Sequence, residues 1–289
     1  MTIYNLGSIN ADYFYRVPHL PAAGETLAAT EMTKGLGGKG ANMSVAAARA
    51  AAHVVHLGAV GKDGRWAVDK MLEYGIDTQA IHVTGTTGHA IINVEESGEN
   101  AIVLFPGANA RVSTQMIAPS LTQAQVGDWF LTQNETSAQV EGAKLAKEMG
   151  LSVAYAAAPF DAVSVSEIAP FVDLLVLNEI EAQQLKDATG RFPHEMNIKD
   201  VIVTRGSEGC DWYNPRGECK HFAALKVDPI DTTGAGDTFT GYVLACLDRG
   251  MSIEQSISLG TKAAAIMVTR RGTADVIPDL RDIQSLYGL

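Results

Sequence analysis

Short apolar runs alternate with longer segments of helical periodicity along most of the chain. The expected strands cover residues 3–6, 53–60, 129–132, 152–156, 174–177 and 201–204. The expected helices cover residues 41–52, 65–74, 137–149, 238–248 and 253–269. Apolar runs of about four to eight residues that alternate with helices are typical of parallel strands buried on both faces. The pattern therefore predicts an α/β fold in which helices cover both faces of a mostly parallel central sheet.

Two regions break this alternation, because they contain extended segments but no helical pattern. Residues 12–34 include a turn cluster around Pro18 and Pro21, and residues 90–105 indicate a hairpin whose turn contains Gly98. Neither region is followed by a helix that would cover it, so we expect the two to pair into a small projecting sheet, a lid over a cleft. The sequence shows no repeat or linker. It therefore predicts one domain over residues 1–289, with lid segments inserted at about 12–34 and 90–106.

Composition and charge exclude several classes of partner. The 289 residues, 46% hydrophobic and 19% charged, are typical of a globular protein with a full core. The 22 basic and 33 acidic residues give a formal charge of −11, which argues against bulk binding to nucleic acid or an anionic membrane. Three cysteines without a C-x-x-C pair fit no disulfide framework, and no apolar stretch approaches about 20 residues. We expect a cytoplasmic protein with a small-molecule partner, no nucleic-acid partner and no membrane partner.

A first glycine cluster, GLGGKGAN at residues 35–42, enters the first expected helix. Gly35, Gly37 and Gly40 match the G-x-G-x-x-G spacing of dinucleotide-binding loops, but a polar segment precedes them instead of a buried strand. Gly40 also stands where a Walker A loop has Ser or Thr. Glycines at a helix start let the backbone approach an oxygen-rich or anionic ligand, and Lys39 adds a positive charge. The alternative is a turn with a glycine-tolerant helix start and no ligand.

A second cluster, DTTGAGDTF at residues 231–239, opens a later helix. A glycine-rich loop at a helix N-terminus offers several N–H donors to a phosphate. Asp237 lies at the end of this loop, where a hydroxyl that attacks the phosphate needs a proton acceptor. The alternative is that Asp237 only caps the helix. A cap does not explain the three small residues before it, so the sequence favours a general base.

Two other expected strands end in residues suited to a nucleotide. Asn178 and Glu181, three residues apart, follow one of these strands and could hold a hydrated Mg²⁺ beside a triphosphate. The alternative is a solvated Glu in the first turn of a helix. The next strand ends at Thr204 and is followed by Gly206 and Gly209, which suits backbone contact with a nucleotide.

The motifs together resemble the ribokinase-like (phosphofructokinase B) family of carbohydrate and nucleoside kinases, and most closely its ribose-phosphorylating members. They are GSINAD at 7–12, GGKGAN at 37–42, GAVGKDG at 58–64, NEIEA at 178–182, VTRGSEG at 203–209, DTTGAGDTF at 231–239 and VTRRG at 268–272. The resemblance implies a three-layer α/β/α sandwich with a mostly parallel central sheet and a small β-sheet lid. It also implies transfer of the γ-phosphate of ATP, with Mg²⁺, to a primary hydroxyl of a sugar. The 5-hydroxyl of ribose is the expected acceptor.

The resemblance also implies a role for each matching residue. The sugar-side residues are Asn10, Asp12, Gly37, Gly38, Lys39, Asn42 and Glu135. The nucleotide-side residues are Asn178, Thr204 and Gly206, with Glu181 beside Asn178 in the motif for magnesium and phosphate. The residues that resemble an anion hole are Gly234, Ala235 and Gly236, and Asp237 resembles the base. Backbone carbonyls that resemble a monovalent-cation (K⁺) site lie near Asp231, Thr233, Met267 and Gly272.

Some positions depart from the family pattern, and alternatives stay open. Val276 stands where a hydroxyl residue commonly assists the cation site, with Thr273 as a nearby substitute. Alternatives within the family are fructokinase-type, nucleoside and phosphosugar kinases, and a phosphosugar kinase needs an extra basic residue in the lid. Alternatives outside it are a dinucleotide-binding oxidoreductase that uses residues 35–40 and a sugar sensor without turnover. A lid with an exposed face favours a homodimer through the lid.

Overall fold

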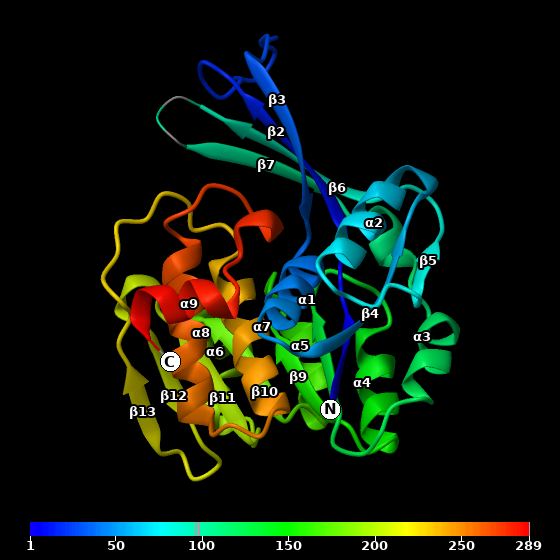
Figure 1. The fold of residues 1–289 in the computed structure, drawn as a ribbon, viewed down its shortest axis with the longest axis vertical. Helices are drawn as coiled ribbons and strands as arrows, with labels where there is room; N and C mark the ends of the chain where they lie inside the picture. Colours follow the sequence, from blue (N-terminus) through cyan, green and yellow to red (C-terminus); the bar gives the residue numbers. More distant parts are fainter. Residues whose placement is uncertain (96, 98, 289) are drawn as a thin grey trace.

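The computed structural model describes residues 1–95, 97 and 99–288, and its centre is a nine-stranded sheet (Figure 1). The order is β13-β12-β11-β10-β9-β8-β1-β4-β5. The strands are β1 (Thr2–Leu6), β4 (His53–Val60), β5 (Ile81–Val83), β8 (Trp129–Gln133), β9 (Ser152–Ala156), β10 (Leu174–Asn178), β11 (Asp200–Thr204), β12 (Cys210–Tyr213) and β13 (Cys219–Phe222). Pairing is parallel from β11 to β5, whereas β12 and β13 add to one edge in antiparallel pairs. The predicted mostly parallel sheet is confirmed.

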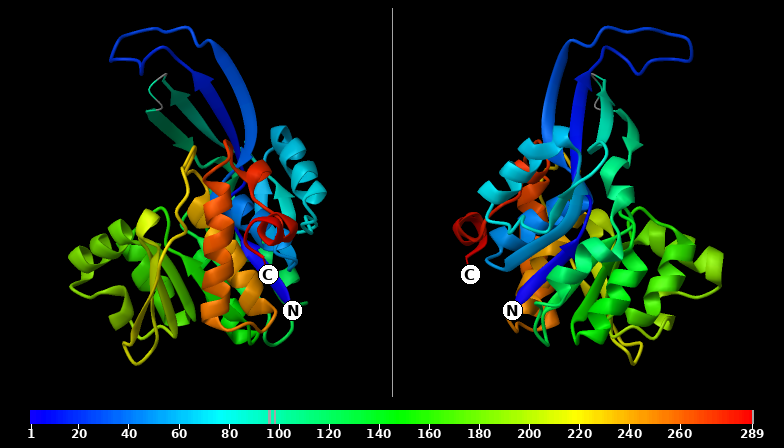
Figure 2. Two further views of the ribbon diagram at one scale, coloured as in Figure 1. Left: turned by 60° about the vertical axis from the view of Figure 1, so that its left-hand side comes forward. Right: turned by 90° about the vertical axis from the view of Figure 1, so that its right-hand side faces the viewer.

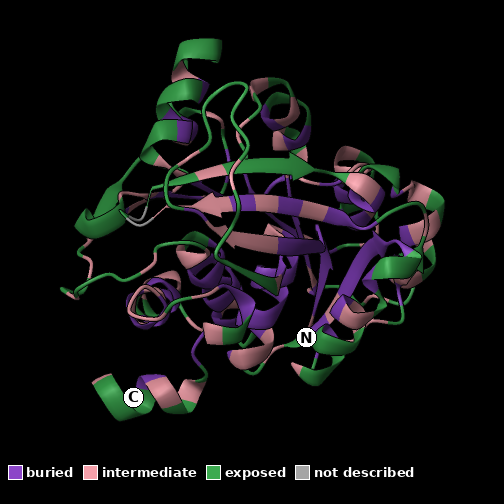
Figure 3. Cartoon of the chain, turned by 90° about the horizontal axis from the view of Figure 1, so that it is seen from above, coloured by how far each residue is buried: buried purple, intermediate pink, exposed green. Residues whose placement is uncertain are grey.

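Helices cover both faces of this sheet, and each face has its own hydrophobic core (Figure 2). One face holds α1 (Lys39–Arg49), α2 (Arg65–Glu73), α7 (Ala235–Asp248), α8 (Ile253–Met267) and α9 (Leu280–Tyr287). The other holds α3 (Thr114–Leu121), α4 (Gln139–Glu148), α5 (Ala162–Ile168) and α6 (Glu179–Thr189). The buried residues, purple in Figure 3, lie on strands and also on helices, α1 and α7 among them. The helices on both faces confirm the expected three-layer arrangement. In the described part of the chain, no helix has the length and hydropathy needed to cross a membrane.

A separate four-stranded sheet, the small sheet, projects from the main body (Figures 1 and 2). In sheet order its strands are β3 (Glu31–Gly37), β2 (Asn10–Arg16), β6 (Gly88–Val94) and β7 (Asn100–Phe105). The two regions without helical pattern therefore do pair, and the turn expected at Gly98 lies outside the described residues. β3 contains the polar segment before the first glycine cluster. Because β3 belongs to the small sheet, the G-x-G-x-x-G spacing lacks the central strand that a dinucleotide fold requires.

Several helix boundaries differ from the expected ones. α1 begins at Lys39 and ends at Arg49, because Ala51 adopts a φ of 67° and turns the chain into β4. α7 begins at Ala235, three residues before its expected start, so Asp237 lies within its first turn. The short helices α3, α5 and α9 have no counterpart among the expected elements.

Candidate active site

Asp237 lies in the first turn of α7, where the second glycine cluster meets the helix. Its side chain is buried, and its Oδ2 accepts a hydrogen bond of 2.9 Å from Nδ2 of Asn42 on α1. The Oδ1 of Asn42 is buried and has no hydrogen-bond partner among the described residues. Asn42 therefore holds the Asp237 carboxylate in one orientation, while its own Oδ1 stays without a partner.

The loop before Asp237 presents backbone amides to open space. The N–H of Gly236 has no acceptor in the described part of the chain, and the space where a side chain at this position would lie contains no other atom within 4 Å. The N–H of Ala235 donates to the carbonyl of Thr232 at 3.2 Å. Of the predicted anion-hole amides, that of Gly236 is therefore available in this conformation and that of Ala235 is engaged.

Glu135, just after β8, is held beside the first glycine cluster. Its Oε2 accepts hydrogen bonds from the hydroxyl of Ser8 and from the backbone N–H of Lys39, the latter at 3.1 Å. The hydroxyl of Ser8 in turn accepts the N–H of Gly40 at 3.2 Å. Burial raises the pKa of Glu135, although the charge of Lys39 and these hydrogen bonds oppose the increase. The carboxylate is therefore fixed between the end of β1 and the start of α1.

The negative charges of three carboxyl groups, Asp237, Glu135 and Glu181, act on the partly buried side chain of Lys39. Burial raises the pKa of Asp12 to about 7, and the negative charges of Glu135 and Asp237 add to the increase. The pKa of Lys39 is also raised, chiefly by the charge of Asp237, against the opposing effect of burial. Lys39 is therefore a permanent positive charge at neutral pH, and Asp12 is protonated in a large fraction of molecules. A polyhydroxyl ligand would find both donors and acceptors here.

Close packing of the backbone explains two glycines of the first cluster. A Cβ at Gly40 would lie 2.3 Å from the Cα of Gly7, so α1 begins directly against the end of β1. A Cβ at Gly37 would lie 1.9 Å from Oδ2 of Asp12. Gly37 and Gly40 are therefore required by contacts within the protein, and they bring the start of α1 next to Asp12.

A cavity of about 670 Å³ lies beside the second glycine cluster. The predicted nucleotide-side residues that line it are Asn178, Thr204, Gly206 and Gly209. Its apolar wall includes Leu225, Phe239, Ala264 and Val268, and Ala235 and Gly236 also line it. A largely apolar cavity with a few polar groups is typical of a site for a flat organic ligand. A ligand in this cavity would reach the amide of Gly236.

Asn178 and Glu181 form a reciprocal cap at the start of α6. Oδ1 of Asn178 accepts the N–H of Glu181, and Oε2 of Glu181 accepts the N–H of Asn178, both at 2.8 Å. Burial raises the pKa of Glu181, although the hydrogen bond from Asn178 and the charge of Lys39 oppose the increase. Oε1 of Glu181 has no hydrogen-bond partner among the described residues and is free for a ligand. In the same residues, no group of three or more metal-ligating side chains occurs.

Asp231 connects the two loops expected to hold a monovalent cation. Its Oδ1 accepts the N–H of Thr233 at 2.9 Å, and its Oδ2 accepts the N–H of Gly272 at 3.4 Å. The carbonyl of Met267 already accepts the N–H of Arg270 at 3.0 Å. Thr273, the substitute considered for Val276, donates its hydroxyl to the carbonyl of Leu36 at 2.9 Å. The hydroxyl of Thr273 is therefore engaged with the base of the small sheet.

Comparison with known proteins decides the family. Residues 2–280 match the model of the pfkB family of carbohydrate kinases. This chain belongs to the pfkB family. The ribokinase of Haemophilus influenzae is 36% identical to this kinase in an alignment of length 294. The alignment covers 96% of this chain and 95% of the relative. A crystal structure of ribokinase from Thermotoga maritima superposes with a TM-score of 0.89 at 33% identity, covering 99% and 98% of the two chains. A structure of Arabidopsis thaliana ribokinase complexed with ribose and ATP gives a TM-score of 0.85 at 25% identity, covering 99% and 97%.

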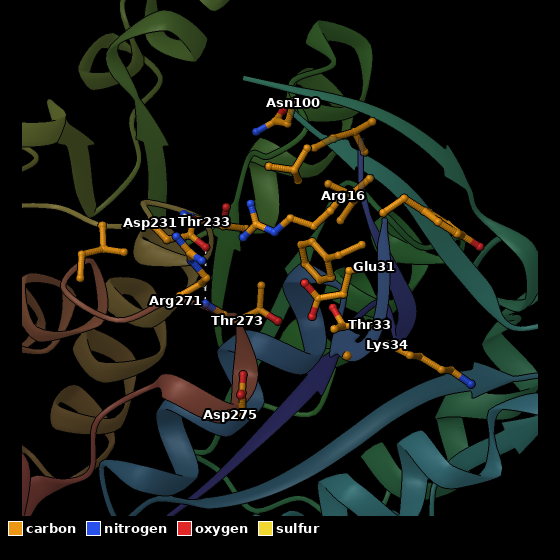
Figure 4. A pocket seen from close by; sticks show the side chains of 18 residues that line it. Arg16, Glu31, Thr33, Lys34, Asn100, Asp231, Thr233, Arg271, Thr273 and Asp275 are labelled. Atoms are coloured by element: carbon orange, nitrogen blue, oxygen red, sulfur yellow. Dashed lines mark hydrogen bonds between the residues drawn. The ribbon is translucent and has the colours of Figure 1, made fainter. Parts of the chain in front are cut away.

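The kinase has a second cavity of about 580 Å³, between the small sheet and the loops near Asp231 (Figure 4). Arg16 lines the cavity from the small sheet, and Asp231 and Arg271 line it from the main body. Arg16 is a basic residue on the expected lid, which a phosphosugar kinase requires. Glu31 lies directly opposite Arg16 in the pairing of β2 with β3 and lines the same cavity. The mixed charge therefore does not favour a second phosphate.

The sequence analysis missed a buried polar network beneath the first glycine cluster. Nδ2 of Asn5 donates to the carbonyl of Gly40 and to the hydroxyl of Ser44, both at 2.8 Å. Ser44 also contacts Nδ1 of His56 at 2.8 Å, and Nε2 of His56 lies 3.0 Å from the carbonyl of Gly7. Burial lowers the pKa of His56 to about 4, so the ring is neutral and can use both nitrogens in this way. The available signal was a polar residue inside each of two expected strands, Asn5 in residues 3–6 and His56 in residues 53–60.

Proposed function

We propose that this kinase transfers the γ-phosphate of ATP to the 5-hydroxyl of ribose and forms ribose 5-phosphate. The observation that carries the proposal is the position of Asp237. Asp237 accepts a hydrogen bond from Asn42 on α1 and raises the pKa of Lys39 through its charge, and the residue before it, Gly236, lines the 670 Å³ cavity. Relatives named ribokinase, one of them solved with ribose and ATP, support ribose as the acceptor.

The reaction follows from the arrangement around Asp237. Asn10, Asp12 and Glu135 bind the sugar hydroxyls, and Asn42 keeps the Asp237 carboxylate aimed at the acceptor oxygen. Asp237 takes the hydroxyl proton as that oxygen bonds to the γ-phosphorus and the bond from phosphorus to the leaving oxygen of ADP breaks. The amide of Gly236 donates to the transferred group. Charge stabilisation and positioning then supply most of the rate enhancement.

The 670 Å³ cavity is the proposed ATP site, with Thr204, Gly206 and Gly209 against the nucleoside. Glu181, through its free oxygen, and Asn178 would hold Mg²⁺, which when bound neutralises charge on the triphosphate. For K⁺, we propose backbone carbonyls of the two loops that Asp231 connects, because the hydroxyl of Thr273 is engaged with Leu36.

We also propose that residues 1–289 act as one domain and that the small sheet closes over the sugar as a lid. Strand β7 is an edge strand whose residues Ile102–Phe105 are largely exposed, and this supports a homodimer through the small sheet. Free cysteines, two of them buried, support a reducing compartment such as the cytoplasm.

A coupled ADP-release assay with pentoses, hexoses, nucleosides and sugar phosphates, with and without K⁺, tests the proposal. We expect ribose to give the highest kcat/KM and K⁺ to increase it. Turnover only with a sugar phosphate, or binding of NAD without binding of ATP, would contradict the proposal. Asp237→Asn should lower kcat by about 10²–10⁴-fold, the usual effect of removing a positioned base. A variant that keeps more than about a tenth of wild-type kcat would exclude Asp237 as the base.

A further inference from the structure

Asn109 occupies the junction at which three strands of the small sheet meet the main body. It lies in a short 3₁₀ helix (Gly107–Arg111) that follows β7, and it is buried next to the starts of β2 and β6. Its Oδ1 accepts the backbone N–H of Ile9 at 3.0 Å, and its Nδ2 donates to Oδ1 of Asn10 at 2.8 Å. No sequence motif indicated Asn109, although it contacts Asn10, a residue that we expect to bind the sugar.

The backbone N–H of Ile9 determines the orientation of both side-chain amides. A backbone N–H can only donate, so the atom of Asn109 that faces it must be the oxygen. The nitrogen of Asn109 then faces Asn10, and the Asn10 atom that receives this bond must be its oxygen. The NH₂ group of Asn10 is therefore the end left for another partner, and in the described residues it has none. Asn109 converts Asn10 from an ambiguous amide into a hydrogen-bond donor.

Two neighbours keep the Asn10–Asn109 pair in place. A Cβ at Gly88, the first residue of β6, would lie 2.3 Å from Nδ2 of Asn109 and 2.5 Å from Oδ1 of Asn10. The absence of a side chain at Gly88 therefore makes room for the pair. The carbonyl of Asn109 accepts the N–H of Ser137 at 3.1 Å, two residues beyond Glu135. Asn109 thus connects the small sheet to the loop that holds the buried sugar-side carboxylate.

We propose that Asn109 is a positioning residue for the sugar, which fixes the amide of Asn10 so that its NH₂ group donates to a sugar oxygen. The inference rests on the proposed function, because it assumes that Asn10 binds the sugar. Without Asn109 the amide of Asn10 is free to rotate, and the acceptor end would face the sugar in part of the molecules. The cost falls on sugar affinity and leaves the nucleotide site unchanged.

The test is Asn109→Asp, with KM for ribose and for ATP measured from pH 5.5 to pH 8.5. An ionised carboxylate still accepts the N–H of Ile9 but cannot donate to Asn10, so KM for ribose should rise about 10- to 100-fold at pH 8.5. A protonated carboxyl has one acceptor for the N–H of Ile9 and one O–H donor for Asn10, and burial favours the protonated form. It lacks only the second N–H, which in wild type donates to the carbonyl of Ile9 at 3.4 Å. The ratio of variant to wild-type KM should therefore fall toward 1 at pH 5.5. KM for ATP should stay within about twofold at each pH.

The design separates positioning from a general structural role. Taking the ratio to wild type removes the pH dependence that both proteins share through Asp12, Glu135 and Lys39. Asn109→Leu can make neither bond, and its ratio should stay high at every pH. A ratio near 1 throughout, or one that does not change between pH 8.5 and pH 5.5 in Asn109→Asp, overturns the inference.

Two controls complete the experiment. Asn93→Asp makes the same chemical change on the opposite face of the small sheet and should leave both KM values unchanged. In Gly88→Ala the added methyl group would clash with the Asn10–Asn109 pair, so this variant should also raise KM for ribose. If the wild type phosphorylates no sugar, the proposed function itself fails. If it phosphorylates ribose and the Asn109→Asp ratio shows no pH dependence, only the role of Asn109 fails.

Discussion

At the scale of the residue, the buried carboxyl group of Asp12 makes the folded protein less stable at high pH than at low pH. Asp12 is 8% exposed and lies near two other acidic side chains, so ionisation is unfavourable there and its pKa rises to about 7. In the unfolded chain the same group ionises near pH 4. The folded protein therefore keeps a proton that the unfolded chain loses between about pH 4 and pH 7. The stabilisation linked to this proton is complete below about pH 4 and is lost as the pH rises through about 7.

Asp12→Asn should therefore stabilise the protein at high pH while it impairs sugar binding. We expect its Tm to exceed that of wild type by several degrees at pH 8 and by less at pH 5, because the amide cannot ionise. KM for ribose should rise at least about tenfold. Thermal unfolding at both pH values checks the prediction, with the exposed Asp69→Asn as control. An equal Tm difference at both pH values would show that Asp12 is not the titrating group.

At the scale of the element, helix α1 positions the base because it packs very closely on α7. A Cβ at Gly241 would lie 2.6 Å from both the Cβ of Ala46 and the carbonyl oxygen of Met43. One turn earlier on each helix, this approach brings Asn42 within hydrogen-bonding distance of Asp237. The distance between the two helices therefore sets the orientation of the carboxylate.

Gly241→Ala tests this packing, since two effects of opposite sign compete. Alanine favours the helix by about 1 kcal/mol. The added methyl group must displace the backbone of α1, and overpacking of this kind costs about 1–3 kcal/mol. We expect a lower Tm and a kcat reduced more than KM for ATP. Gly35→Ala is the control, because the nearest atom to its Cβ is 3.9 Å away. A Tm above that of wild type would mean that the helices separate at little cost.

The alternation of apolar runs predicted the central strands well, because a strand buried on both faces leaves a continuous apolar signature. The starts of α1 and α7 were misplaced because each helix begins inside a glycine cluster, where propensity favours a loop. Helices α3, α5 and α9 are seven or eight residues long, too short for a clear period. The glycine clusters and Asp237 were visible as local motifs. Asn109 was not, because its partner Asn10 is 99 residues away in the sequence and only folding brings them together.

At the scale of the whole molecule, the small sheet is covered least along β7. Val103 is 67% exposed and Phe105 is 48% exposed, and the free edge of β7 offers unpaired backbone groups. Apolar side chains on an exposed edge strand favour pairing with another chain, and a second copy presents the same surface by symmetry. The molecule is therefore expected to form a dimer of about 61 kDa, twice the 30.6 kDa of the chain.

Val103→Lys should shift the protein toward the monomer in light scattering coupled to size-exclusion chromatography. The substitution places a charge on the exposed strand, where burial in an interface would be costly and exposure in the monomer is not. Val163→Lys on α5 is the matched control, because Val163 is 65% exposed but far from the small sheet in sequence and in fold. It should leave the mass unchanged. A wild-type protein that elutes as a monomer would contradict the dimer, and a dimer that both variants preserve would place the interface elsewhere.

If the dimer also restrains the small sheet, Val103→Lys should raise KM for ribose more than KM for ATP, since β7 leads directly into the junction that holds Asn10.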